Sequence, residues 1–141
     1  MSKSDITINL SGGVATFESI RFLPGSTISG EAVIYPNEDI NCKRLVIILG
    51  WQTRGRGTRY SKTIEEREIF QGELRQGMPR TFNFSFTLPH EPWSHEGHYV
   101  SIDWLIQVKI DIPFAKDTNE LQTFLLYPDP PETGDDTWGV V

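Results

Sequence analysis

The sequence predicts an all-β protein folded as an antiparallel β-sandwich of seven or eight strands. Residues 99–113 alternate between apolar and polar side chains, with Leu105 as the one apolar exception on the polar side. Because neighbouring side chains of a strand point to opposite faces, this segment forms one long strand with a core face and a solvent face. Residues 81–88 show the same alternation. Such faces need a second sheet to cover them. The core-facing residues of the long strand are Val100, Ile102, Trp104, Ile106, Val108, Ile110 and Ile112.

The first third of the chain predicts three strands. Residues 6–10 alternate and form a short strand, and residues 14–17 form either a second short strand or the return arm of a hairpin. Pro24-Gly25 is a turn signal, and a strand follows over residues 27–35. Gly30 lies on the core-facing side of that strand, which indicates a bulge or a close backbone approach.

The middle of the chain predicts two strands of different character. Residues 44–51 contain an unbroken apolar run, which is typical of a strand covered on both faces. After a loop at residues 53–61, residues 62–70 form a polar strand near a sheet edge, where charges discourage strand addition. Part of this strand also fits a helix. Residues 71–79 form a turn-rich connection.

The last third predicts a loop at residues 89–97 before the long strand, and a final strand at residues 120–126. Residues 128–141 contain three prolines and four acids but no base. We therefore expect a sandwich domain over residues 1–127, followed by a flexible acidic tail over residues 128–141.

Size and composition describe one ordinary globular domain. The chain has 141 residues, 38% of them apolar and 23% charged, which suffices to bury roughly two thirds of the extended surface. No segment approaches the roughly 20 apolar residues of a membrane span, and no secretory signal is visible at the N-terminus. Cys42 is the only cysteine, so it cannot form an internal disulfide and is expected to be a small core residue. We expect a cytoplasmic protein without a transmembrane segment.

The charge distribution argues against nucleic acid as a partner. The net charge is −6, and the 127 residues before the tail carry 13 bases against 15 acids. Proteins that bind nucleic acid usually have a net basic domain, and an acidic tail repels phosphate backbones.

Three ordered segments resemble arrestin-like domains. Residues 22–31, FLPGSTISGE, resemble the family's Pro-Gly turn followed by a glycine-containing strand. Residues 82–89, FNFSFTLP, resemble its alternating phenylalanine strand. Residues 92–97, PWSHEG, which lead into the strand at 100–113, resemble the segment that follows.

The resemblance implies an arrestin-like, immunoglobulin-like sandwich that binds proteins and has neither catalytic activity nor a cofactor. Relatives of this fold include a retromer subunit and bacterial sporulation-control proteins. Arrestins have two lobes, whereas this chain is long enough for one. The tail contains Pro130-Pro131 but no PPxY motif, so binding to WW domains is not expected.

Arg54, Arg56 and Arg59 are the first candidate binding residues. They alternate with Gly55 and Gly57 in the predicted loop. Glycines let backbone N–H groups approach a ligand, and guanidinium groups bind carboxylate or phosphate in a bidentate manner. The loop is therefore either a site for an acidic peptide or a hairpin kept in solution by its charge.

His90, His95 and His98 lie close together with Glu91 and Glu96 before the long strand. Imidazole and carboxylate bind zinc, but this spacing matches no known motif, so these residues are only weak metal candidates and we expect no metal. The neighbouring Ser94-His95 pair lacks a GxSxG nucleophile elbow. We therefore do not expect an enzyme.

The tryptophans divide into a core residue and possible ligand-binding residues. Trp104 belongs to the core by parity. Trp51 and Trp93 lie near strand ends, where they either pack at the rim of the sandwich or form an aromatic platform for a sugar. In the tail, Trp138 either docks onto the body or forms a linear motif for a partner, and Val141 permits strand addition to a carboxylate-binding domain.

These observations predict a non-catalytic adaptor or scaffold that binds a protein or peptide partner through sheet edges and loops. The expected mechanism is strand addition at an exposed edge, assisted by the arginine loop. An exposed edge also allows a homo-oligomer. The alternative function is a carbohydrate-binding module that uses its rim tryptophans.

Overall fold

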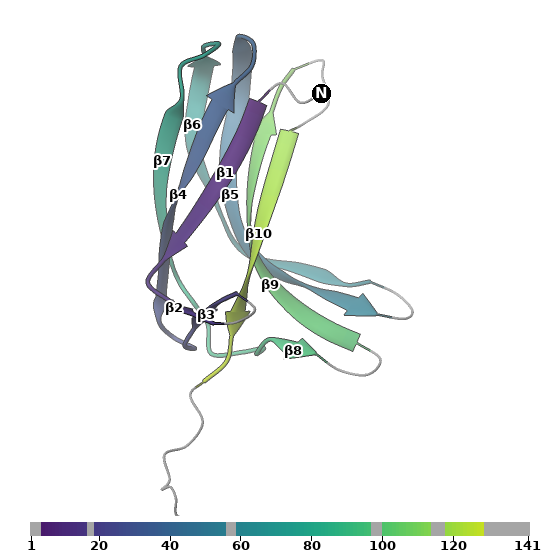
Figure 1. Cartoon of the computed structure of the whole chain (residues 1–141). Helices are drawn as coiled ribbons and strands as arrows, with labels where there is room; N and C mark the ends of the chain where they lie inside the picture. Colours follow the sequence, from purple (N-terminus) through teal and green to yellow (C-terminus); the bar gives the residue numbers. More distant parts are fainter. Residues whose placement is uncertain (1–3, 17–18, 56–58, 97–99, 114–117, 129–141) are drawn as a thin grey trace, which may run out of the picture.

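The structure is a computed structural model that describes residues 4–16, 19–55, 59–96, 100–113 and 118–128. These residues form ten strands and no helix (Figure 1). Accordingly, the described part of the chain contains no helix that could cross a membrane. The strands are β1 (Ser4–Ser11), β2 (Val14–Ala15), β3 (Ile20–Phe22), β4 (Thr27–Pro36), β5 (Ile40–Gly55), β6 (Ser61–Leu74), β7 (Arg80–Thr87), β8 (His95–Glu96), β9 (Val100–Asp111) and β10 (Thr118–Leu126).

The strands form two sheets, which confirms the predicted sandwich. The small sheet has the order β1-β4-β7, and the large sheet has the order β2-β3-β10-β9-β5-β6, with β8 paired to β9. Every pairing is antiparallel except that of β3 with β10. Because β2 pairs with β3, residues 14–15 are not the return arm of a hairpin with β1.

Two strands exceed the predicted number of eight. They are β3 and β8, which contain three and two residues. Segments this short are too brief for an alternating pattern to identify a strand, so pairing with other strands defines them instead. Part of the predicted loop at 89–97 thus forms β8.

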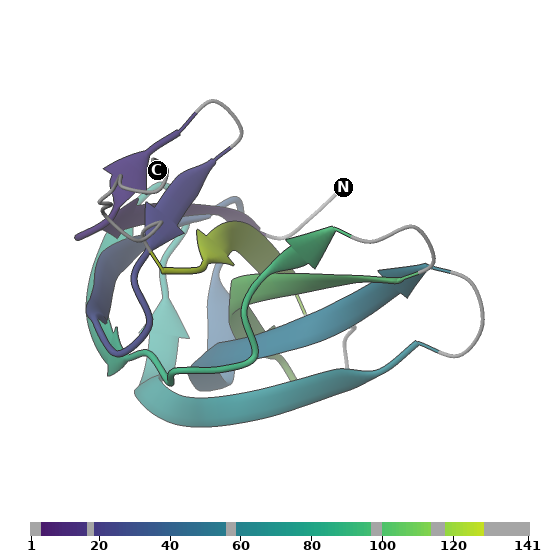
Figure 2. The same ribbon diagram turned by 90° about the horizontal axis from the view of Figure 1, so that it is seen from below.

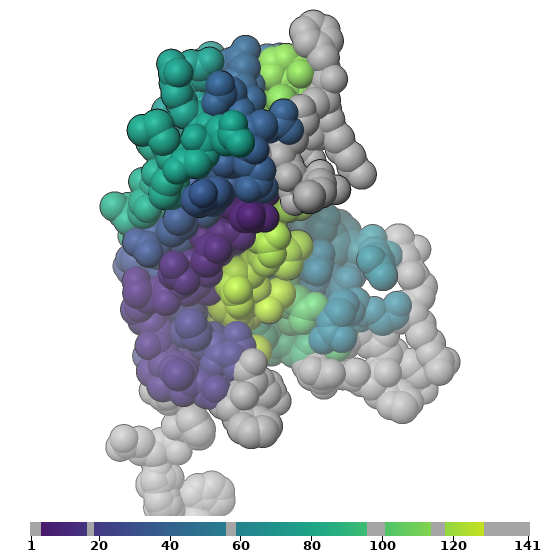
Figure 3. All heavy atoms as spheres, turned by 45° about the horizontal axis from the view of Figure 1, so that its top comes forward, coloured from purple at the N-terminus to yellow at the C-terminus, as the bar shows by residue number. Residues whose placement is uncertain are grey.

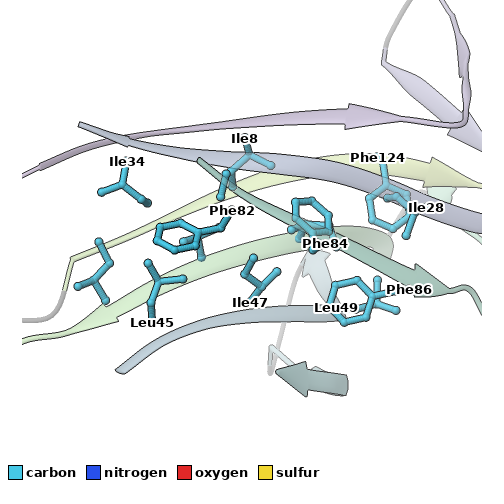
Figure 4. Packing of buried hydrophobic residues seen from close by; sticks show 14 of the residues in the cluster. Ile8, Ile28, Ile34, Leu45, Ile47, Leu49, Phe82, Phe84, Phe86 and Phe124 are labelled. Carbon is cyan, nitrogen blue, oxygen red and sulfur yellow. The ribbon is translucent and has the colours of Figure 1, made fainter. Parts of the chain in front are cut away.

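The core lies between the two sheets and contains the predicted face of β7, together with the predicted face of β9 from Trp104 onward; Ile102, predicted to be a core residue, is only half-buried. Trp104 in β9 is fully buried. Figure 4 shows the phenylalanines of β7 pointing toward apolar residues of β5, between the two layers. Burial of each large apolar side chain stabilises the fold by about 1.5–3 kcal/mol. The facing residues in this view are Phe82, Phe84 and Phe86 of β7, and Leu45, Ile47 and Leu49 of β5.

Gly30 in β4 permits a close approach rather than a bulge. Its register with both β1 and β7 is continuous. A Cβ atom at this position would overlap the backbone oxygen of Asn9 on β1 and lie 2.7 Å from Cζ of Phe84 on β7, so both neighbouring strands occupy the space that a side chain would need. The bulges occur instead in the pairing of β5 with β6, for example between Leu49 and Gly50.

β5 and β6 are longer than the sequence indicated. β5 continues to Gly55 and β6 runs from Ser61 to Leu74, so the predicted loop at 53–61 and connection at 71–79 are shorter. Backbone hydrogen bonding extends the hairpin, because Thr53 N donates to Tyr60 O at 2.8 Å. The helical alternative for β6 is wrong, since pairing with β5 fixes it as an edge strand.

The apolar run in β5 is buried on both faces, as predicted. Ile47 faces the small sheet, whereas Val46 and Ile48 face outward and are also buried. Leu105, the apolar exception in β9, is likewise buried. Farther along, the last part of β5 and the first parts of β6 and β9 bend away from the small sheet, and β8 pairs with β9 there (Figure 2).

Candidate binding groove at the loop end of the sandwich

A largely apolar groove of about 870 Å³ lies where the β3–β4 and β7–β8 loops meet the beginning of β9. We call it the loop-end groove; Figure 2 views the molecule from this end. Two of its large apolar side chains are unusually accessible, Trp93 at 52% and Leu23 at 41%. Its lining consists of Leu23, Pro24, His90, Glu91, Pro92, Trp93, Ser94, His95, Ile102 and Pro128.

The β7–β8 loop is fixed to the core and to β10 by hydrogen bonds. The buried indole of Trp104 donates from Nε1 to Pro92 O at 2.7 Å. Ser94 N donates to Leu126 O at 2.7 Å, and Ser94 Oγ accepts from Leu126 N at 2.9 Å. A ligand that binds here therefore does not have to order this wall, which lowers the entropic cost of binding.

The β3–β4 loop is fixed in the same way. Leu88 N donates to Ser26 O at 2.8 Å, and Gly25 N donates to Pro89 O at 3.4 Å. Gly25 has a φ of +79°, and a Cβ atom there would lie 2.6 Å from Cε1 of His90. The positive φ favours glycine at this turn, and the His90 imidazole packs directly on it.

Trp93 offers an apolar surface without an unmet donor. Its Nε1 donates to His90 O at 2.8 Å, which also fixes the orientation of the ring. The remaining polar groups of the lining include the side chains of His90, Glu91 and His95. An apolar groove with a few polar groups is typical of a binding site for an apolar side chain or a small ligand.

Two of the three predicted histidines come together in the groove. His90 and His95 both line it, whereas His98 lies outside the described residues. The described residues contain no group of three His, Cys, Asp or Glu side chains that could hold a metal ion. The three histidines therefore stay weak candidates for a zinc site, which would need His98, and the absence of a metal stays a prediction.

The predicted arginine site is only partly described. Arg54 donates to Asp103 on the neighbouring strand, from Nε to Oδ2 at 2.6 Å and from Nη2 to Oδ1 at 3.3 Å. This bidentate pair commits the guanidinium of Arg54 within the molecule. Arg59 is exposed, and Arg56 lies outside the described residues. Binding of an acidic peptide by this loop stays a prediction.

The structure separates the two rim tryptophans. Trp51 lies opposite Trp104 in the β5–β9 register and packs against Tyr60, with ring centroids 5.4 Å apart. It is half-buried and is not part of the loop-end groove. Trp93 therefore lines the groove without Trp51. The two tail candidates, Trp138 and Val141, lie outside the described residues.

The candidate nucleophiles are engaged or buried. Ser94 Oγ accepts from the Leu126 backbone. Cys42 is buried, and burial, together with the charges of Asp111 and Glu68, raises the pKa of its thiol to about 11. Because thiolate is the reactive form, Cys42 is an inert core residue, as the sequence indicated.

The sheet edges differ in how they are protected against strand addition. β6 carries six charged residues in fourteen. The β7 edge is partly covered by Arg67 of β6, which donates to Ser85 O and whose guanidinium lies 4.4 Å from the centroid of the Phe86 ring. β1 carries a single charge, Asp5, and no described strand pairs with its outer side. Figure 3 shows β10 beside β1 on this face.

Several lining residues of the groove were not recognised in the sequence. Leu23 appeared only within the family-like segment, Pro24 only in that segment and as part of a turn signal, and Ile102 only as a core residue. Ile102 is instead half-buried, because this end of β9 extends past the small sheet. A usable signal was the exposed Trp93 next to Pro92 in a loop that precedes a long strand.

Among solved structures, the chain is similar to Spo0M, the sporulation control protein of Bacillus subtilis. The TM-score is 0.69 at 15% sequence identity, over 92% of this chain and 51% of Spo0M. The fold is arrestin-like, as the sequence segments indicated. The chain spans about half the length of Spo0M. No protein-family model and no curated relative matches the sequence, so the likeness establishes the fold alone.

Proposed function

We propose that this protein is a non-catalytic adaptor that binds a segment of a partner protein in the loop-end groove. The observation that carries the proposal is a preformed apolar groove with an exposed, orientationally fixed Trp93. Exposed aromatic anchors beside apolar pockets are frequent hot spots of protein interfaces. The arrestin-like fold, which Spo0M shares, is generally used without catalysis and agrees with a regulatory or adaptor role.

Strand addition is a second contribution to partner binding within the same function. At β1, which carries a single charge, strand addition would use the part of the edge that β10 does not cover. Main-chain hydrogen bonds along β1 would add affinity, whereas the groove would select the side chain of the partner.

Two further observations support the choice of function. Ser94 and Cys42 offer no activated nucleophile, which supports a non-catalytic role. A sugar platform needs stacked aromatic surfaces, and the lining of the groove supplies Trp93 alone among the tryptophans. The single, buried, free cysteine agrees with a cytoplasmic protein.

The test is a selection of displayed peptides on the full chain, followed by affinity measurements by fluorescence anisotropy. We expect selected peptides to carry an aromatic or large aliphatic anchor, and Trp93→Ala to weaken their binding about tenfold or more. Tyr35→Ala is the matched control, because Tyr35 is an exposed aromatic residue on β4 away from the groove.

Equal loss of affinity in both variants, or no loss in either, would contradict the proposed site. Glycans that quench tryptophan fluorescence in the wild type but not in Trp93→Ala would support the carbohydrate-binding alternative instead.

A further inference from the structure

We propose that residues 129–141 of the same chain bind in the loop-end groove, with Trp138 as the anchoring side chain. The tail then acts as an internal ligand that competes with the partner. This inference rests on the proposed function, because it assigns a second occupant to the same groove.

The tail leaves the body of the protein at the groove itself. Pro128 is the last described residue and lines the groove, so the tail begins within its binding site. The preceding residues are fixed there, because Leu126 N donates to Ser94 Oγ at 2.9 Å and Tyr127 N donates to Phe22 O at 3.3 Å. The point at which the tail starts is therefore held against the groove wall.

The tail is also long enough for Trp138 to return to the groove. Trp138 follows Pro128 by ten residues. Ten residues span at most about 33–36 Å when extended, and a flexible chain of this length has a root-mean-square span of roughly 16–19 Å. The tether is long enough for the chain to turn back to the groove and short enough to keep the indole at an effective concentration in the millimolar range.

The apolar side chain of the tail also matches the exposed apolar side chains of the groove. Before Val140, Trp138 is the only large apolar side chain of the tail, and the tail otherwise contains acids, prolines, glycines and threonines. The groove presents the exposed side chains of Trp93 and Leu23. Indole can pack against both, because aromatic pairs favour offset or edge-to-face contact.

The charged groups near the start of the tail are compatible with binding of the acidic tail in the groove. Arg21 lies over the ring of Tyr127, with Cζ 5.2 Å from the ring centroid, and Asp129 follows two residues after Tyr127. The imidazoles of His90 and His95 line the groove, and Glu91 is its one carboxylate. The four acids of the tail therefore meet a rim that is not strongly acidic.

The experiment uses full chains and a labelled synthetic peptide of residues 129–141 as the probe. We expect this peptide to bind the Trp138→Ala chain about threefold to tenfold more tightly than the wild type, because the intact tail of the wild type competes for the groove. Trp93→Ala combined with Trp138→Ala should abolish binding, whereas Tyr35→Ala combined with Trp138→Ala should not change it.

Equal affinity of the peptide for the wild type and Trp138→Ala would overturn the inference. So would backbone amide resonances of Leu23, His90 and Trp93 that are the same in both chains. Shifts of these resonances that appear only as the protein concentration rises would also overturn it, since they would mean that the tail binds a second copy.

A further experiment distinguishes failure of the proposed adaptor function from failure of the internal-ligand proposal. The peptide selection described above, carried out on the Trp138→Ala chain, removes competition from the tail. Selected peptides that bind this chain and the wild type with equal affinity leave the adaptor function standing and overturn the internal ligand. If no peptide can be selected while the tail peptide still binds, the adaptor function fails and the internal ligand stands.

Discussion

Trp104 and Trp93 lie eleven residues apart and occupy opposite environments. Trp104 is fully buried between the sheets, whereas Trp93 is 52% exposed in the loop-end groove. Both indoles nevertheless donate to the same loop, Trp104 to Pro92 O and Trp93 to His90 O. One loop therefore joins the core to the groove, so that core packing positions the site while the exposed ring remains available to a ligand.

The largest expected effect comes from the buried member of the pair. Trp104→Ala should lower the free energy of unfolding by about 3–5 kcal/mol, because it leaves a large cavity and removes the donor to Pro92 O. Denaturant unfolding followed by circular dichroism measures this loss. Trp104→Phe retains most of the apolar volume and should lose less. A Trp104→Ala protein as stable as the wild type would show that the core is not organised around this residue.

The next effect tests the close packing of β4 against its neighbours β1 and β7 within the small sheet. Gly30→Ala should lower the free energy of unfolding by about 1–3 kcal/mol, because the added methyl group overlaps the backbone oxygen of Asn9 and the Phe84 ring. Ser29→Ala is the control, since Ser29 is the preceding residue and its side chain points to the opposite face of β4. Equal stability of the two variants would mean that both β1 and Phe84 move aside without cost.

Burial of Trp104 and exposure of the groove differ in how far they could be predicted. Trp104 follows from parity along one strand, which is local information. The groove joins Leu23, residues 90–95, Ile102 and Pro128, and their proximity depends on where the turns and the sheet pairing place them. The pair of Arg54 with Asp103 was likewise hidden, since it joins neighbouring strands across 49 residues.

A smaller effect concerns the buried thiol. The pKa of Cys42 is raised from 9.0 to about 11, so the native state retains its proton at pH values where the unfolded state has lost it. The stabilisation is complete below pH 9 and is lost as pH rises toward 11, by up to roughly 2 kcal/mol. Urea unfolding across this range measures the decline.

Cys42→Ala is the control for this pH dependence. Removing the thiol should lower stability at neutral pH by a modest, constant amount and remove its part of the decline between pH 9 and 11. A decline of the same size in both proteins would assign the pH dependence to other groups.

Substitution of the exposed Trp93 should have the smallest effect on stability. It also tests most directly whether Trp93 and Trp104 have different roles. Trp93→Ala should change the free energy of unfolding by less than about 1 kcal/mol, because half of the ring already contacts water and its hydrogen bond to His90 O is exposed. Binding of selected peptides should nevertheless fall about tenfold or more. The two measurements together separate a residue that binds a partner from one that maintains the fold. If Trp93→Ala destabilised the protein as strongly as Trp104→Ala, Trp93 would be part of the structural framework, and the exposed ring would no longer identify a binding site.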